Sequence, residues 1–325
     1  MYCETCGAPH ACPFQLTQTP PPVSAALAAA PHGLNGIFNV NKPAGLTSHQ
    51  VVYRIRKSSG LARVGHAGTL DPMATGVLLI CIGQAVRVTE YLIDHAKKYR
   101  ARVRLGIETD TYDATGVVVA EHVVAVNQAQ VESALVRFVG PSAQMPPAFS
   151  AIKKDGVRLY ELARRGVQVE CTPRPIEIFS IAVRALALPD IEFDVHCSKG
   201  TYIRSLAHDL GAALGCGACL TALTRTASGQ FALEDALPLA QLCEAFGKKC
   251  AEHYLNPLDE ALLRFQAVVV NEQDARRVTL GNSLNCEREY DTPLLRVYAP
   301  SGECIALLER GKRAGEWKPQ KVFAS

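Results

Sequence analysis

The predicted strands and helices of this sequence do not follow the regular strand–helix–strand order of a parallel sheet. Residues 98–105 alternate between basic and apolar side chains, which predicts a strand with one buried face. Residues 77–82 are all apolar and predict a fully buried strand. Residues 47–57 and 128–139 carry apolar side chains at helical spacing. This pattern favours an α+β fold, with a mixed, largely antiparallel sheet and flanking helices, over a doubly wound parallel sheet.

The composition changes along the chain and divides it into three parts. The 325 residues correspond to roughly two domains at about 150 residues each. Residues 1–35 carry three consecutive prolines and an alanine-rich run, and we expect a poorly ordered extension there. Residues 36–257 contain the long predicted elements and form the expected main domain. Residues 258–325 contain short strand-like runs separated by turn residues, which predicts a small β-barrel-like domain.

The composition also excludes several classes of protein. The chain has 34 Lys+Arg and 31 Asp+Glu, and this net charge of +3 excludes a histone-like polycation or an acidic solvating chain. We find no phosphate loop, complete dinucleotide fingerprint, zinc-protease motif or serine-hydrolase elbow, so we expect no ATP, dinucleotide or other cofactor. The twelve cysteines are scattered, and the sequence shows no export signal and no apolar run of about 20 residues. We therefore expect reduced thiols, a cytoplasmic location and no membrane segment.

The N-terminal extension contains four soft ligands that could hold zinc. They lie within ten residues of one another and are Cys3, Cys6, His10 and Cys12. A structural zinc site usually closes a larger loop between two ligand pairs, and no second pair follows these four. Unliganded cysteines are therefore the favoured interpretation, and zinc is the alternative.

Asp71 is the first carboxylate after Glu4, and the stretch between them is rich in basic residues. It lies in the glycine-rich segment 65–76, which leads directly into the buried strand predicted at 77–82. A loop attached to a buried strand is a rigid mount for a catalytic group. We expect the surrounding cations to keep Asp71 ionised, so it could act as nucleophile, base or electrostatic stabiliser. The alternative is a simple turn aspartate before proline.

Other positions suggest contact with a polyanion or a flat ring. Tyr99 lies on the apolar face of its predicted strand and is either a core tyrosine or a ring that stacks on a base. The opposite face carries Lys98, Arg100, Arg102 and Arg104, which either follow phosphates or are simply solvated. Arg204 falls in the first turn of a predicted helix, where a cation is unfavourable, which indicates a specific carboxylate or phosphate partner. Residues 144–174 mix basic and aromatic side chains, which suits looped RNA or a plain surface helix.

Several long segments, taken together and in order, resemble the TruB family of tRNA pseudouridine synthases. They cover the chain from about residue 36 to 239 and are segments 41–48, 65–76, 97–99, 105–116, 146–153, 197–204 and 223–225. The resemblance implies the pseudouridine synthase fold, a C-terminal RNA-binding domain of the PUA type and activity as a monomer without cofactor. It also implies isomerisation of uridine 55, in the T-loop of tRNA, to pseudouridine.

The resemblance assigns roles residue by residue. Asp71 matches the essential catalytic aspartate, Tyr99 the active-site tyrosine, and Arg204 the arginine that pairs with the aspartate. Five further positions match substrate-binding residues, namely Lys42 and Pro43 at the pocket floor, His66 beside the flipped nucleotide, Lys153, and the apolar Leu223. Thr224 departs from the family pattern, which often has arginine there, and the extension before residue 36 is not part of that pattern.

Three alternatives to a stand-alone tRNA enzyme remain at this stage. The first is a guide-dependent pseudouridine synthase that acts on ribosomal RNA, and activity on naked tRNA would argue against it. The second is an RNA-binding or RNA-folding protein that keeps the scaffold without catalysis. The third is an enzyme of small nucleosides, whose activity would not fall steeply with salt.

Overall fold

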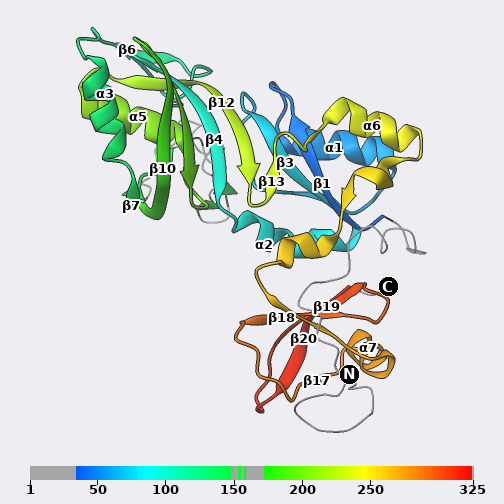
Figure 1. The fold of residues 1–325 in the computed structure, drawn as a ribbon. Helices are drawn as coiled ribbons and strands as arrows, with labels where there is room; N and C mark the ends of the chain where they lie inside the picture. Colours follow the sequence, from blue (N-terminus) through cyan, green and yellow to red (C-terminus); the bar gives the residue numbers. More distant parts are fainter. Residues whose placement is uncertain (1–33, 148, 150–152, 155–156, 159–171, 324–325) are drawn as a thin grey trace, which may run out of the picture. The chain divides into compact units, whose positions relative to one another are not determined.

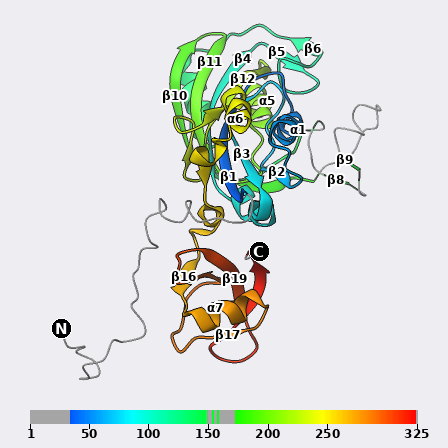
Figure 2. The same cartoon turned by 90° about the vertical axis from the view of Figure 1, so that its right-hand side faces the viewer.

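The computed structural model describes residues 34–147, 149, 153–154, 157–158 and 172–323. The candidate zinc ligands Cys3, Cys6, His10 and Cys12 and the side chain of Lys153 lie outside the described part of the chain. Two compact units are present (Figures 1 and 2), one formed by Gly36–Asn256 and one containing Pro257–Ser325.

The first unit is built on an 11-stranded mixed sheet. Its strands are β1 (Gly36–Lys42), β2 (Val64–Ala67), β3 (Thr75–Ile82), β4 (Lys97–Leu105), β7 (Gly140–Gln144), β10 (Arg174–Ala187), β11 (Asp190–Cys197), β12 (Ala218–Ser228), β13 (Phe231–Ala232), β14 (Leu237–Pro238) and β15 (Leu255–Asn256). The main path runs β14–β1–β3–β12–β4–β11–β10–β7 (Figure 1). β1 pairs with β14 and β3 with β12 in parallel, and the other described pairings of this sheet are antiparallel. The predicted mixed, largely antiparallel sheet is therefore confirmed.

Smaller elements complete the unit. Two short antiparallel pairs lie outside the large sheet, β5 (Ile107–Thr109) with β6 (Val118–Glu121) and β8 (Lys153–Lys154) with β9 (Val157–Arg158). The helices are α1 (Ser48–Ser59), α2 (Thr89–Ile93), α3 (Gln128–Val136), α5 (Ile203–Leu214) and α6 (Leu239–Gly247), with 3₁₀ turns η2 (Gly83–Val88) and η3 (Ala251–Tyr254). α5 packs on β12 and β4, α3 packs on α5, and α1 packs on α6 (Figure 1). No helix in the described residues is long and apolar enough to cross a membrane.

Helix α1 begins where the sequence predicts. The Thr47 hydroxyl accepts from the backbone N–H of Gln50, and the Gln50 side chain accepts in return from the backbone N–H of Thr47. This reciprocal capping stabilises the first turn, and Gly60 ends the helix with φ 70°, a left-handed conformation that glycine adopts without strain.

Helix α3 is shorter than predicted. The apolar pattern extends the helix to residue 139, but α3 ends at Val136. Phe138 and Val139 form hydrogen bonds to carbonyls three residues earlier instead of four. This tighter turn rotates the following side chains away from the buried face, and Val139 is exposed rather than inward.

The outer face of β4 carries a ladder of ion pairs with β11. Arg100 pairs with Asp194 at 2.9 Å, Arg102 with Glu192 at 3.0 Å and Arg104 with Asp190 at 2.8 Å. The two strands are in register at each of these pairs. Because every arginine of this ladder has a carboxylate partner, the face does not present a row of free cations for phosphates. We refer to these three pairs as the β4–β11 charge ladder.

The second unit contains a five-stranded sheet in the order β16–β18–β19–β20–β17. Its elements are η4 (Leu258–Leu262), β16 (Gln266–Val269), α7 (Glu272–Thr279), β17 (Leu284–Asn285), β18 (Leu294–Tyr298), β19 (Cys304–Arg310) and β20 (Glu316–Val322). Val278, Leu295 and Trp317 belong to a hydrophobic cluster made only of residues from this unit. The short strands predicted here are confirmed.

Candidate active site

Asp71 lies on the loop between β2 and β3, and contacts hold the residues on both sides of it. The Ser48 hydroxyl accepts from the backbone N–H of Leu70 at 2.9 Å and lies 3.2 Å from the Leu70 carbonyl. On the other side, the Pro72 carbonyl accepts from the backbone N–H of Gly45 at 2.8 Å. The carboxylate is therefore carried by a backbone with little freedom to move, as a catalytic group requires.

Lys42 ends β1 and is fully buried beside this loop. Its ammonium donates to the carbonyls of Pro43 at 2.8 Å, Leu46 at 2.7 Å and Pro72 at 3.2 Å. Burial lowers the pKa of Lys42 to about 8, and the Asp71 charge opposes this shift. Lys42 therefore joins the turn after β1 to the Asp71 loop, while the ring of Pro43 is exposed.

Arg204, in the first turn of α5, pairs with Asp71. Its Nη2 donates to Oδ1 of Asp71 at 3.0 Å, and its Nε lies 2.9 Å from Oδ2 without the alignment of a hydrogen bond. The guanidinium also donates to the carbonyls of Thr111 at 3.2 Å and Phe149 at 2.9 Å. The anionic partner expected for a cation at this helix start is thus a carboxylate.

Asp113 is a second carboxylate beside Arg204, and no role is predicted for it from the sequence. It is buried, and its Oδ2 lies 3.7 Å from Nε of Arg204. Its Oδ1 accepts from the Thr111 hydroxyl at 3.0 Å and from the backbone N–H of Thr115 at 2.9 Å. The signal available in the sequence was its position in segment 105–116, one of the segments that resemble the TruB family.

Burial raises the pKa of the Asp71 carboxyl above its usual 3.8, and the nearby Asp113 charge acts in the same direction. Arg204 and Lys42 lower this pKa, but by less. Desolvation is the larger effect and opposes the cations, and the ionised state of Asp71 stays a prediction. Arg204 remains the group that most favours the ionised form of Asp71.

Tyr99 is buried on the inner face of β4, directly opposite Arg225 of β12. Burial raises the pKa of Tyr99, and the charge of Arg225 opposes this. Arg225 also donates to the Gly68 carbonyl at the start of the Asp71 loop, so Tyr99 and this loop both adjoin Arg225.

Arg225 is the largest side chain that is completely buried in the described structure. Its Nε donates to the Val77 carbonyl at 2.6 Å and its Nη2 to the Gly68 carbonyl at 3.0 Å. It was part of a segment that resembles the TruB family, but no role was predicted for it. Its partners are backbone oxygens far away in sequence, which no local pattern reveals.

The remaining predicted substrate-binding residues lie on two strands. Leu223 is buried on β12, opposite Ala101 of β4 and two residues before Arg225. His66 is half-buried on β2, opposite Ile80 of β3. Thr224, where the family often has arginine, forms a 2.9 Å hydroxyl–hydroxyl hydrogen bond with Thr75 at the end of the Asp71 loop.

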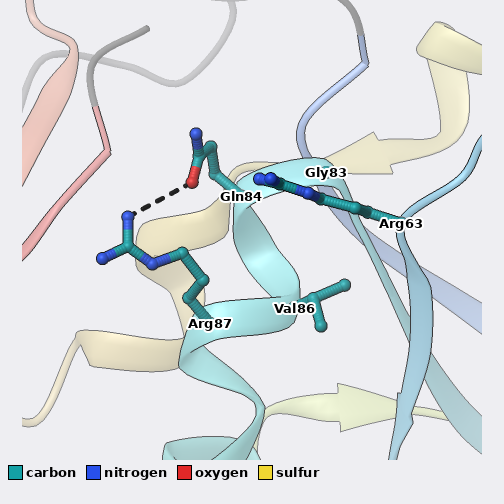
Figure 3. Close-up of a pocket in the computed structure, with 5 residues that line it drawn as sticks. All are labelled: Arg63, Gly83, Gln84, Val86 and Arg87. Carbon is teal, nitrogen blue, oxygen red and sulfur yellow. Dashed lines mark hydrogen bonds between the residues drawn. The ribbon is translucent and has the colours of Figure 1, made fainter.

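An open pocket lies at the other end of β3 (Figure 3). Arg63, Gly83, Gln84, Val86 and Arg87 line it, and the backbone N–H of Gly83 donates to the Arg63 carbonyl at 3.0 Å. Arg87 donates to the Gln84 side chain at 3.4 Å. The eight residues of β3 separate this pocket from the Asp71 loop by roughly 25 Å, so it is a different site.

Comparison with known proteins identifies the family. The N-terminal domain of the TruB family of pseudouridylate synthases matches residues 56–203, and the tRNA pseudouridylate synthase B C-terminal domain matches residues 204–263. A tRNA pseudouridine synthase B of Syntrophotalea carbinolica is 47% identical over 76% of this chain and 81% of its own length. One of Dehalococcoides mccartyi is 40% identical over 90% of this chain and 97% of its own.

The chain belongs to the TruB family of pseudouridylate synthases.

Solved structures show the same fold. A structure of an H/ACA RNP bound to a substrate RNA containing 2′-deoxyuridine contains a chain with a TM-score of 0.67 and 26% identity, covering 89% of this chain and 85% of that one. A Cbf5–Nop10–Gar1 complex contains a chain with a TM-score of 0.69 and 26% identity, covering 93% and 87%. This TruB-family chain therefore has the pseudouridine synthase fold, and Asp71 and Arg204 form an ion pair in its first unit.

Proposed function

We propose that this protein isomerises a uridine of tRNA, the T-loop uridine 55, to pseudouridine. Membership of the TruB family and relatives named tRNA pseudouridine synthase B support the reaction and the substrate. The observation that carries the assignment of the site is the Asp71–Arg204 ion pair, with contacts of 2.9 and 3.0 Å on an anchored loop.

The reaction moves one bond and leaves the composition of the RNA unchanged. The glycosidic bond from the ribose to N1 of uracil breaks, the base turns, and a new bond forms from the ribose to C5. The proton of C5 is lost and N1 is protonated. Asp71 assists the detachment of the base, either as nucleophile at the sugar or as base for a sugar proton. No oxidant, reductant or nucleotide is consumed, in agreement with the expectation that no cofactor is needed.

The other residues bind and orient. The uridine must leave its stack, which costs least in a loop. Tyr99 holds the base, while Arg204 keeps Asp71 ionised. Five further residues bind the nucleotide in this proposal, namely Lys42, Pro43, His66, Lys153 and Leu223.

RNA binding extends beyond the nucleotide. We propose that residues 258–325 form a PUA-type domain that binds the tRNA arm outside the loop, and that residues 36–257 form the catalytic domain. Arg63 is exposed and lines a pocket together with Arg87 (Figure 3). These two arginines are the cations that contact the phosphate backbone of the tRNA. The protein acts as a monomer in the cytoplasm, and residues 1–35 are an extension outside the catalytic domain.

The test is incubation of purified protein with an unmodified tRNA transcript, without added metal or nucleotide, followed by mapping of pseudouridine. We expect pseudouridine at one T-loop uridine with the native protein and none with Asp71→Asn. Product formed by Asp71→Asn at the native rate would refute the role of Asp71. Binding of tRNA without product would support the RNA-binding alternative.

A guide-dependent enzyme is the second candidate, because chains of H/ACA complexes share this fold at 26% identity. The relatives named for tRNA are more similar, at 40% to 47% identity. Turnover of naked tRNA by the isolated protein would decide for the stand-alone enzyme. No turnover of tRNA, together with turnover of ribosomal RNA only when a guide RNA is added, would decide for the guide-dependent enzyme.

A further inference from the structure

The completely buried guanidinium of Arg225 requires an explanation. A charged group removed from water is costly unless hydrogen bonds replace its hydration. Arg225 is 1% exposed, and its guanidinium donates to two neutral oxygens, the carbonyls of Gly68 and Val77. An apolar side chain could fill the same space without this cost, so the charge is not needed simply to pack the sheet.

These contacts adjoin the candidate site. Gly68 comes three residues before Asp71 and Val77 six residues after it, so Arg225 bonds to the backbone on both sides of Asp71. Arg225 is also directly opposite Tyr99 on the neighbouring strand β4. One residue thus lies between the loop that carries the carboxylate and the tyrosine.

The backbone of Arg225 occupies the same central place. Strand β12 lies between β3 and β4, and Arg225 is opposite Gly76 on one side and Tyr99 on the other. A Cβ on Gly76 would come within 2.2 Å of the Arg225 carbonyl oxygen, and Gly76 has φ 98°, so only glycine fits there. The end of the Asp71 loop is therefore in direct backbone contact with β12 at Arg225.

We propose that Arg225 is a positioning residue that holds Tyr99 and the Asp71 loop in one geometry for turnover. This inference rests on the proposed function. Arg225 acts through Tyr99 and the loop and does not touch the substrate.

The test compares Arg225→Lys with the native protein in single-turnover experiments at saturating tRNA. Lysine keeps the positive charge but carries all its donors on one nitrogen, so it cannot span the two carbonyl oxygens that the guanidinium bridges. We expect a fall in the rate constant of about 10-fold to 100-fold, as for small displacements of catalytic groups, with the Kd for tRNA unchanged. Combined with Tyr99→Phe, the two effects should be less than additive in free energy, because Arg225 acts through Tyr99.

Arg296→Lys is a matched control from the second unit. Arg296 is also buried, and it donates to the Phe265 carbonyl at 2.9 Å and to the Tyr298 hydroxyl at 2.7 Å. The two substitutions remove similar hydrogen bonds and should lower Tm to a similar degree. The control should keep the native rate constant at saturating tRNA.

Several outcomes would overturn the inference. An unchanged rate constant for Arg225→Lys, or full additivity with Tyr99→Phe, would show that Arg225 does not act through the tyrosine. Arg225→Gln, which removes the buried charge, is the second variant if the lysine variant does not fold. Loss of the native circular dichroism in both would assign Arg225 a purely structural role. Failure of the native protein to form pseudouridine would instead refute the proposed function.

Discussion

Burial and the charge of Arg204 act in opposite directions on the pKa of Asp71. Burial raises the pKa of Asp71, while the ion pair with Arg204 lowers it. The reaction proposed for this site needs the carboxylate, so activity is lost as the pH falls through this pKa. Any change at residue 204 therefore alters the acid limb of the pH profile as well as the maximum rate.

Replacing Arg204 with glutamine should move that acid limb to higher pH. Without the cation, burial and the Asp113 charge raise the pKa of Asp71 further, and a larger fraction is protonated at a given pH. We also expect the rate at neutral pH to fall by about 100-fold or more, because the half-buried carboxylate of Asp71 loses its oriented partner. The measurement is the single-turnover rate against pH for native, Arg204→Gln and Arg204→Lys proteins. A limb that stays at the same pH in Arg204→Gln would show that Asp71 is not the group that titrates.

At the residue scale, the sequence identifies the candidate catalytic residues better than it identifies the residues that hold them in place. Asp71, Tyr99 and Arg204 stand out by spacing, charge and resemblance, and the structure pairs Asp71 with Arg204. Arg225 and Asp113 do not stand out, because their importance comes from contacts with Gly68, Val77 and Arg204, which are distant in the chain. A buried arginine held by backbone oxygens leaves no complementary charge in the sequence to signal it.

At the scale of the elements, local patterns predict the start of a helix and the faces of a strand. Thr47 caps α1, and β4 alternates between buried and exposed residues along its whole length. The end of α3 was predicted wrongly, since the turn after Val136 tightens without any change in the apolar pattern. The function of the basic face of β4 was left open, although the acidic residues of β11 repeat at the same spacing.

The β4–β11 charge ladder leads to a prediction about RNA binding. Arg102 is an exposed arginine with a carboxylate partner, and exposed pairs of this kind contribute only about 0.2–1 kcal/mol to stability. Arg102→Ala should therefore leave the Kd for tRNA and its salt dependence unchanged. Arg63→Ala, at the pocket beyond β3, should weaken tRNA binding and reduce the slope of log K against log salt by about 1. Binding measured at several salt concentrations checks both, and equal losses in the two variants would contradict the distinction.

At the scale of the whole molecule, the two units differ in their expected tasks. The second unit has its own hydrophobic cluster, and the candidate catalytic residues all belong to the first unit. Family resemblance at the level of sequence covered mainly the first unit, and the matched C-terminal family domain ends at residue 263. The assignment of a PUA-type domain to residues 258–325 therefore stays a prediction.

Removal of residues 258–325 should weaken tRNA binding without changing the rate at saturation. The reason is that the bonds around Asp71, Lys42 and Arg204 all lie within residues 36–256. The measurement is the dependence of the single-turnover rate on tRNA concentration, with circular dichroism to verify folding of the shortened protein. An unchanged concentration dependence would show that the second unit does not bind the tRNA used.

The position of β12 has a consequence for synthesis of the protein. It is the strand that joins β3 to β4, yet it is made after both of them and after β10 and β11. A nascent chain that ends before Ala218 contains β3 and β4 but lacks the strand that lies between them. The pairing of β12 with β3 and β4 must therefore come late in folding, because it closes a large loop and loses the corresponding chain entropy. A growing polypeptide on the ribosome accordingly has no assembled catalytic centre until its central strand has emerged.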